Sequence, residues 1–124
     1  MTARCEGELA ARLVLIYTGQ RRLARNLLRA VMGRWMARDP EMSTLLAEIA
    51  ALACAEYAAL ADGDLDALGE LLGRHWGINK RMDAGCTNPF IDDLIAACAP
   101  YLVGSKLAGA GGGGFVLGIA RDAD

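Results

Sequence analysis

The chain has 124 residues, of which 54% are hydrophobic and 23% charged, and its formal net charge is −2 at pH 7. This length suits one domain with its own buried core and leaves no room for a second. The small negative charge excludes a bulk attraction to nucleic acid or to an anionic membrane, and no apolar run approaches the roughly 18 uninterrupted residues of a membrane span. We therefore expect a single domain with neither nucleic-acid nor membrane partners.

The N-terminus, residues 1–8, is polar and mixed in charge. Such a segment does not match a secretory signal peptide, so a cytoplasmic location is expected. The four cysteines, Cys5, Cys54, Cys86 and Cys98, include no Cys-x-x-Cys pair. Because structural zinc sites use such short spacings, we expect no metal site.

The apolar run Leu13–Tyr17, closed by Thr18-Gly19, is too short for a helix and rich in β-forming residues. It predicts a buried strand in a central position. After this run the apolar residues recur at steps of three and four. That period predicts three amphipathic helices, over residues 20–39, 41–61 and 64–76, the last with Asp64 as its N-cap.

Residues 77–85 lose this period and predict a loop. Thr87-Asn88-Pro89 then predicts a helix start, because Asn88 can accept from first-turn N–H groups and Pro89 needs no donor at the first helical position. Further on we expect a short strand around Lys106-Leu107 and another over residues 115–120, joined by a glycine-rich loop. This order predicts an α+β fold in which helices cover one face of a small antiparallel sheet.

The loop between the last two strands, residues 109–114, is glycine at every position except Ala110. Glycine lacks a Cβ atom, so this backbone can approach a ligand closely, and successive N–H groups can converge on an anion. The spacing satisfies Gly-x-Gly-x-x-Gly, but dinucleotide and Walker loops open a helix and this loop opens a strand. A flexible linker or a plain hairpin turn is the alternative interpretation.

The stretch Lys-Leu-Ala-Gly-Ala-Gly-Gly-Gly-Gly-Phe, residues 106–115, closely resembles the third conserved motif of the GHMP kinases, the galactokinase, homoserine, mevalonate and phosphomevalonate kinase superfamily. Residues 15–24 and 79–89 resemble the fucokinase and heptose-7-phosphate kinase branch of that superfamily. The resemblance implies a ferredoxin-like C-terminal kinase domain over residues 1–124. It also implies ATP-dependent phosphoryl transfer to the hydroxyl group of a sugar or sugar phosphate.

In GHMP kinases, the loop that holds the nucleotide phosphates and the acidic residue near the acceptor hydroxyl belong to an N-terminal domain. No such segment occurs in this sequence. The resemblance therefore implies the C-terminal half of a kinase, which has no catalytic residue of its own and is inactive without its N-terminal partner domain. ATP and Mg²⁺ are implied for the full kinase, and neither is expected to bind this half tightly.

The family usually continues with a further helix and strand after the strand that matches residues 115–120. We therefore expect the sheet to be truncated, with an unpaired edge and an exposed apolar face. Unpaired edges invite strand addition from another copy. Self-association through the sheet edge is the resulting expectation.

The family's third motif packs against the phosphate loop and helps to form the floor of the substrate site. Carried over, this role falls on Lys106, Gly109, Ala110, Gly111, Gly112, Gly113 and Gly114. Lys106 would supply a cation near phosphate, or it is an exposed strand lysine. The acceptor-sugar pocket would be lined by residues after the first strand: Thr18, Gly19, Gln20 and Arg21.

Other interpretations stay open for individual residues. Arg21 also fits a solvated helix face, and Asp83, which would contact sugar hydroxyls, also fits a turn. The only histidine, His75, has no acidic or cysteine partner at a recognisable spacing, which favours a structural role. For the whole chain, the alternative from another class is a stand-alone ferredoxin-like module that binds a small metabolite without catalysis.

Overall fold

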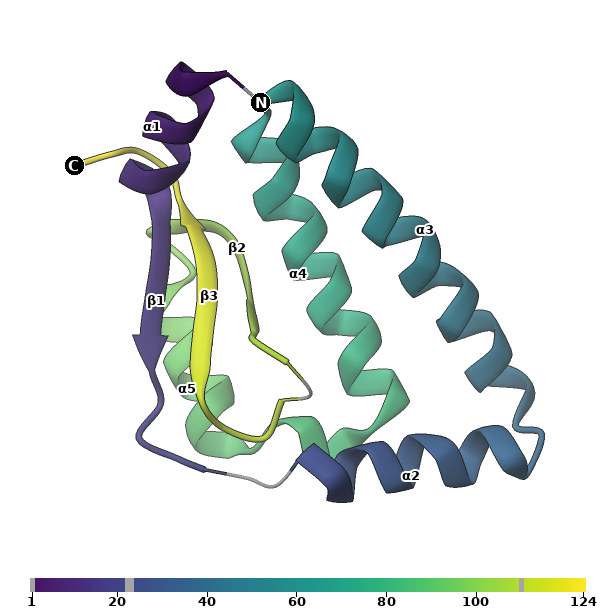
Figure 1. Ribbon diagram of the computed structural model, residues 1–124. Helices are drawn as coiled ribbons and strands as arrows, with labels where there is room; N and C mark the ends of the chain where they lie inside the picture. Colours follow the sequence, from purple (N-terminus) through teal and green to yellow (C-terminus); the bar gives the residue numbers. More distant parts are fainter. Residues whose placement is uncertain (1, 22–23, 110) are drawn as a thin grey trace.

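The computed structural model describes residues 2–21, 24–109 and 111–124, with only the backbone described at residues 24 and 25. Two long antiparallel helices stand beside a small sheet, and a shorter helix crosses their ends (Figure 1). The elements in chain order are α1 (Ala3–Arg12), β1 (Leu13–Tyr17), α2 (Ala24–Met36), α3 (Pro40–Asp62), α4 (Leu65–Met82), the 3₁₀ turn η1 (Ala84–Cys86), α5 (Pro89–Cys98), β2 (Leu102–Leu107) and β3 (Phe115–Ala120). The predicted α+β order is confirmed.

The described strands form one antiparallel sheet in the order β1-β3-β2. Tyr17 lies opposite Phe115 in one ladder, and Leu107 lies opposite Val116 in the other. The prediction of a central position for Leu13–Tyr17 is wrong, because β1 is an edge strand. Its residues alternate between exposed and half-buried, so this continuous apolar run does not reflect burial on both faces.

Helical side chains pack on both faces of the sheet, which corrects the expectation of helices on one face. Successive side chains of a strand point to opposite faces, so Val116 and Ile119 face opposite ways. Val116 belongs to a buried cluster with Ile91 of α5, whereas Ile119 belongs to a cluster with Leu65 of α4. Accordingly, α5 lies behind β1 and β3 in Figure 1, and α4 lies beside β2.

Helix α4 is longer than its sequence pattern predicts. It continues through residues 77–82, where we expected a loop, and ends at Met82 with Asp83 as its C-cap. Ile78 and Met82 pack with Leu45 and Leu52 of α3. This contact between two helices stabilises a segment whose own glycine favours a break.

Capping follows the sequence rules in the middle of the chain. The Asp64 side chain accepts from the Ala67 N–H at 3.0 Å, and the Asn88 side chain accepts from the Ile91 N–H at 3.0 Å, as predicted. Helix α1, for which the sequence shows no decisive pattern, begins after an N-cap at Thr2. At its other end Arg12 donates to the Ala120 carbonyl at 2.8 Å, which fixes α1 to the sheet.

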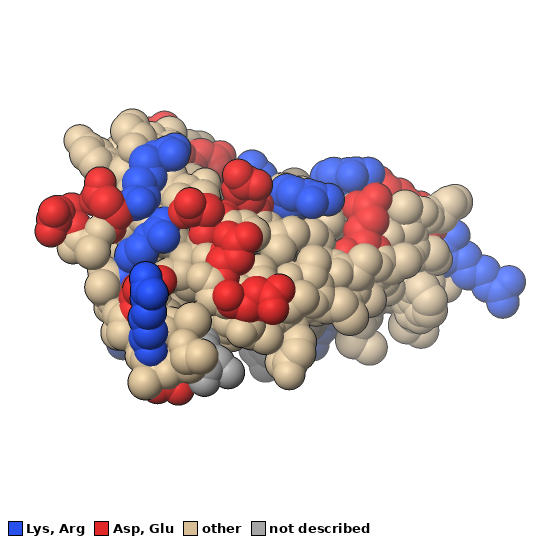
Figure 2. All heavy atoms as spheres, turned by 90° about the horizontal axis from the view of Figure 1, so that it is seen from above, with Lys and Arg blue, Asp and Glu red and all other residues tan. Residues whose placement is uncertain are grey.

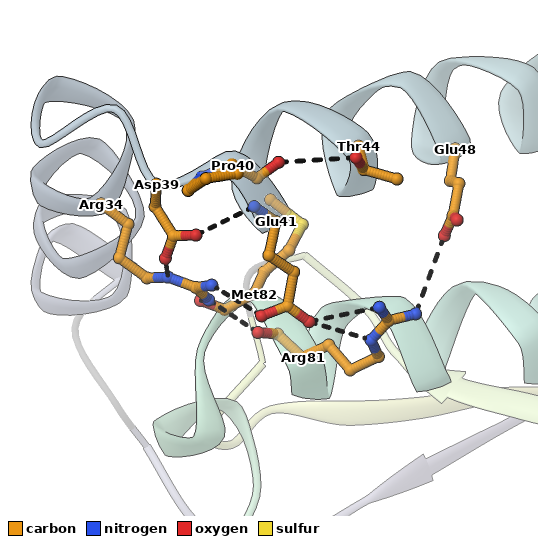
Figure 3. A network of polar contacts seen from close by, with 8 residues as sticks. All are labelled: Arg34, Asp39, Pro40, Glu41, Thr44, Glu48, Arg81 and Met82. Atoms are coloured by element: carbon orange, nitrogen blue, oxygen red, sulfur yellow. Dashed lines mark hydrogen bonds and ion pairs between the residues drawn. The ribbon is translucent and has the colours of Figure 1, made fainter.

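A polar network joins the ends of three helices (Figure 3). The Arg34 guanidinium, at the end of α2, contacts the Asp39 carboxylate at 2.8 Å and the Glu41 carboxylate at 3.2 Å at the start of α3. It also donates to the carbonyls of Arg81 and Met82 at 2.7 and 2.8 Å, at the end of α4. One side chain therefore fixes the corner where α2, α3 and α4 meet.

Helix α3 is the one helix within the described ranges that is long and apolar enough to cross a membrane by length and composition. Only 17% of its most apolar window is buried. One such helix is weak evidence for a membrane span, and here α3 packs along α4. Charges of both signs are interspersed on the face of the molecule seen in Figure 2, with no extended field of one sign.

Candidate functional site

The glycine loop, residues 108–114, connects β2 to β3 and opens a strand, as predicted. The Ala108 N–H donates to the Phe115 carbonyl at 2.9 Å and closes the hairpin. On one side the Gly112 N–H donates to the carbonyl of Cys86, and on the other the Gly114 N–H donates to the carbonyl of Gln20 at 2.9 Å. Three separate sequence segments therefore meet at this loop.

Two of the loop glycines are required by close packing. A Cβ atom on Gly111 would lie 2.7 Å from the Cys86 carbonyl oxygen, and one on Gly113 would lie 2.6 Å from the Gln20 carbonyl oxygen. Real Cβ atoms do not approach other atoms this closely, so any side chain at either position displaces a neighbouring segment. This packing contradicts the alternative of a flexible linker. Ala110, part of the predicted site, lies outside the described residues.

From the sequence we expected that successive N–H groups of the loop could converge on an anion. The structure corrects this expectation in part, because some of these N–H groups have partners within the chain. The N–H groups of Gly112 and Gly114 are already bonded to carbonyl groups of the chain. In the described part of the chain, Gly109, Gly111 and Gly113 donate no such bond. Gly113 is buried, whereas Gly109 is exposed and Gly111 half-buried, so the loop offers a close-packed backbone surface on which the N–H groups of Gly109 and Gly111 are still available.

The residues after β1 divide into two pairs. Thr18 is buried, and its hydroxyl donates to the Gly114 carbonyl at 2.8 Å. The Gln20 side chain accepts from the Asn88 amide at 2.8 Å, which connects the loop to the start of α5. Gly19 and Arg21 are exposed, so Thr18 and Gln20 hold the loop whereas Gly19 and Arg21 face solvent.

Lys106 is buried in β2, so the alternative of an exposed strand lysine is wrong. Its ammonium group donates to the Leu107 carbonyl at 2.7 Å. Burial lowers the pKa of this ammonium group, and the nearby Glu56 carboxylate partly opposes that effect. In this arrangement the ammonium group is bonded within its own strand, and its role near phosphate stays a prediction.

A cavity of about 150 Å³ opens beside the glycine loop. It lies between α2, α3 and the end of α4, and its wall consists of Leu27, Leu28, Val31, Ile49, Asn79, Met82, Asp83, Cys86 and Gly109. The sequence singled out Asp83 and Gly109 but not the residues from α2 and α3. Those residues belong to ordinary amphipathic stripes, which carry no signal of a binding site.

Two titratable groups near the site have explicit partners. Asp83 accepts from the Gly85 N–H at 2.8 Å, so the turn role is present and contact with sugar hydroxyls stays a prediction. Burial, followed by the charge of Asp83, raises the pKa of the Cys86 thiol to about 11. A thiol with that pKa is almost wholly protonated at neutral pH, so Cys86 acts here as a packing group.

His75 has an acidic partner that its sequence neighbours did not indicate. Its Nδ1 lies 2.9 Å from the Glu56 carboxylate of α3, 19 residues away. This pair ties α3 to α4, which agrees with a structural role. Among residues 2–21, 24–109 and 111–124, no group of three or more His, Cys, Asp or Glu side chains could hold a metal ion.

Residues 56–124 match the family model described as "GHMP kinases C terminal". The chain belongs to this family. The match covers more than half of the chain, including the glycine loop and the cavity residues from α4 onward. The predicted resemblance to GHMP kinases is thereby confirmed.

Two curated relatives cover most of this GHMP domain. The bifunctional fucokinase/GDP-fucose pyrophosphorylase of Arabidopsis thaliana is 38% identical over 94% of the chain, and the L-fucokinase/L-fucose-1-P guanylyltransferase of Bacteroides fragilis is 33% identical over 88%. The chain spans only 11% and 12% of the lengths of these relatives. Both are fucokinases, as the branch resemblance predicted.

Solved structures support the fold of the domain. The crystal structure of L. major mevalonate kinase in complex with R-mevalonate has a TM-score of 0.80 with 22% identity, over 89% of this chain and 33% of that one. Another mevalonate kinase has a TM-score of 0.62 with 20% identity, over 98% of this chain and 36% of that one. At these identities the likeness concerns the fold and not the substrate.

Proposed function

We propose that this GHMP domain forms the acceptor side of the active site of an ATP-dependent sugar kinase, with L-fucose as the sugar. An N-terminal domain would supply the phosphate loop and the acidic group, and the complete enzyme would act in the cytoplasm. The observation that carries the proposal is the meeting of three segments at a fixed glycine loop beside a cavity. Fucokinase relatives over most of the chain support the choice of sugar.

The described residues fit a surface beneath the ATP phosphates. Gly109 is exposed and Gly111 half-buried, and their N–H groups, which donate no bond among the described residues, are suited to phosphate oxygens. ATP supplies the phosphoryl group when bound. The chain's own contribution is to hold this surface rigid through Thr18 and Gln20, which matters because phosphoryl transfer depends mainly on positioning and charge neutralisation.

The described donors do not fit a magnesium site within this domain. Mg²⁺ prefers carboxylate and phosphate oxygens in octahedral geometry, and no group of at least three acidic, histidine or cysteine side chains comes together among the described residues. We therefore assign the carboxylate ligands of Mg²⁺ to the N-terminal domain. The cation near the phosphates would also come from there if Lys106 keeps its bond to Leu107.

The proposal is tested by assaying the complete kinase for ADP release with ATP and a panel of L-fucose, a heptose 7-phosphate and mevalonate. We expect turnover with L-fucose above the other two. Gly113→Ala should lower kcat/KM, since its Cβ atom displaces Gln20, whereas Gly33→Ala on α2 should not, because nothing lies within 4 Å of its Cβ position. ADP release with none of the sugars, together with tight metabolite binding by this domain, would favour the non-catalytic binding module instead.

A further inference from the structure

We propose that the cavity beside the glycine loop receives the methyl end of a 6-deoxyhexose, while Asn79 and Asp83 meet the sugar's hydroxyl groups. This inference rests on the proposed function and adds to it the residues that select the sugar. It concerns the cavity between α2, α3 and the end of α4, whose boundary includes Gly109 of the loop. A sugar bound there lies next to the surface assigned to the phosphates.

The wall of the cavity is mostly apolar. Helix α2 contributes Leu27, Leu28 and Val31, and helices α3 and α4 contribute Ile49 and Met82. Its volume is about 150 Å³, and apolar protein cavities of about that size bind a molecule such as benzene. Such a wall favours a methyl group, whose burial is stabilised by the hydrophobic effect, over any group that needs a hydrogen-bond partner.

Two polar side chains interrupt this apolar wall. The side-chain amide of Asn79 has no hydrogen-bond partner among the described residues. The Asp83 carboxylate accepts one bond, from the Gly85 N–H at 2.8 Å, and a carboxylate can accept several more. Together they offer donors and acceptors for neighbouring hydroxyl groups, which fixes the orientation of a ring whose methyl end points toward α2.

L-fucose and L-galactose test this orientation, because they differ only in having a methyl or a hydroxymethyl group at the same carbon. In the bound orientation proposed here, the extra hydroxyl of L-galactose enters the apolar wall without a partner. Hydrophobic pockets reject an added hydroxyl by roughly 100-fold at most. We therefore expect kcat/KM for L-fucose to exceed that for L-galactose by about 10- to 100-fold.

The variant Val31→Thr places a hydroxyl in the wall at nearly constant volume. In the complete kinase it should narrow the L-fucose to L-galactose ratio by about threefold or more, since burying a methyl group against a hydroxyl is less favourable. The control Met32→Thr introduces the same residue at the next, exposed position of α2, outside the cavity wall. It should leave the ratio unchanged. If Val31→Thr lowers the unfolding midpoint markedly, Val31→Ala replaces it. It should also narrow the ratio, because it removes apolar contact with the methyl group of L-fucose and leaves room for the extra hydroxyl of L-galactose.

A second readout does not depend on turnover. In saturation-transfer NMR with the complete kinase, the methyl protons of L-fucose should receive the largest share of saturation, because the apolar wall surrounds them. Equal kcat/KM for the two sugars, an unchanged ratio in Val31→Thr and Val31→Ala, or weak saturation of the methyl group would overturn the assignment of the cavity while leaving a fucokinase function intact. Phosphorylation of neither sugar would overturn the proposed function itself.

Discussion

Gly113 and Gly33 show how differently two glycines in this chain are constrained. Gly113 faces the Gln20 carbonyl, and a Cβ atom there would lie 2.6 Å from its oxygen. Gly33 lies on exposed α2, and nothing lies within 4 Å of its Cβ position. Replacing glycine by alanine should therefore change the free energy of unfolding in opposite directions at the two positions.

We predict that Gly113→Ala lowers the free energy of unfolding by about 1–3 kcal/mol, the usual cost of inserting a methyl group into a packed site. Gly33→Ala should raise it by about 0.5–1 kcal/mol, because alanine is the better helix former. Urea unfolding of the two variants measures both effects. An equal change in the free energy of unfolding for both variants would mean that the loop can accommodate a side chain at position 113 and is not closely packed there.

Asn88 performs two tasks with one side chain. Its oxygen accepts from the Ile91 N–H and caps α5, while its amide nitrogen donates to the Gln20 side chain at 2.8 Å. The Gln20 carbonyl in turn accepts from the Gly114 N–H. We infer that Asn88 and Gln20 are positioning residues for the glycine loop.

The two tasks separate in the variant Asn88→Ser, since serine caps a helix about as well as asparagine but is too short to reach Gln20. We expect nearly unchanged overall stability and about 3- to 10-fold faster hydrogen exchange of the Gly114 amide, as local opening becomes easier. Gln20→Met, which removes the same contact from the other side, should give the same increase. Unaltered exchange at Gly114 in both variants would show that the loop does not depend on this contact.

Among the elements, the corner of α2, α3 and α4 depends on Arg34 (Figure 3). A hydrogen bond from Arg34, opposed in part by desolvation, lowers the pKa of the Asp39 carboxyl from its ordinary 3.8. A carboxyl whose pKa is lower in the folded state stabilises the fold above its unfolded pKa, and this contribution is lost as pH falls through the folded value. The corner should therefore weaken in acid below pH 3.8.

We predict that Arg34→Gln lowers the thermal unfolding midpoint at pH 7, and that its difference from the unsubstituted chain shrinks as pH falls below about 4, where Asp39 becomes protonated. Arg81→Gln is the matched control, because Arg81 contacts Glu41 from a more exposed position, with 55% of its side chain accessible compared with 28% for Arg34. Exposed ion pairs contribute little, so the control should shift the midpoint less. A difference that is independent of pH would contradict the role of Asp39.

For the whole molecule, the free edge of β1 is the least protected feature. In the described sheet β1 pairs with β3 alone, and Leu13–Tyr17 contains no charged residue or proline. Leu13, Leu15 and Tyr17 are also exposed beside Phe115. Proteins usually guard such edges with charges, prolines or bulges, so we propose that two copies of this chain pair through β1.

We predict a concentration-dependent increase in mass by light scattering at tens of micromolar, and a return toward the monomer in Leu15→Lys. Met32→Lys controls for added charge, because Met32 and Leu15 are equally exposed, each at 60%, and Met32 lies on α2 away from the edge. Self-association of the control should persist. A chain that stays monomeric throughout this range would contradict the proposal.

Much of the fold was predictable because it depends on local signals. Asp64 and Asn88 were identifiable as caps because a helix start needs a side-chain acceptor at a fixed spacing from the first N–H groups. The glycine loop and the strand after it were likewise identifiable from residues next to one another. Family membership followed from that same loop, because its order of residues is specific.

Only the tertiary structure decided where these elements meet. The sequence pattern of Leu13–Tyr17 is the same for a central and an edge strand, and the edge position follows from pairing with a strand about 100 residues away. Residues 77–82 are helical because α3 packs against them. Likewise the cavity wall from α2, the burial of Lys106 and the contact of Gln20 with Asn88 arise from long-range packing. The sequence by itself determined the local elements and the loop chemistry, whereas contacts between distant segments, which leave no periodic signal, determined the site around the loop.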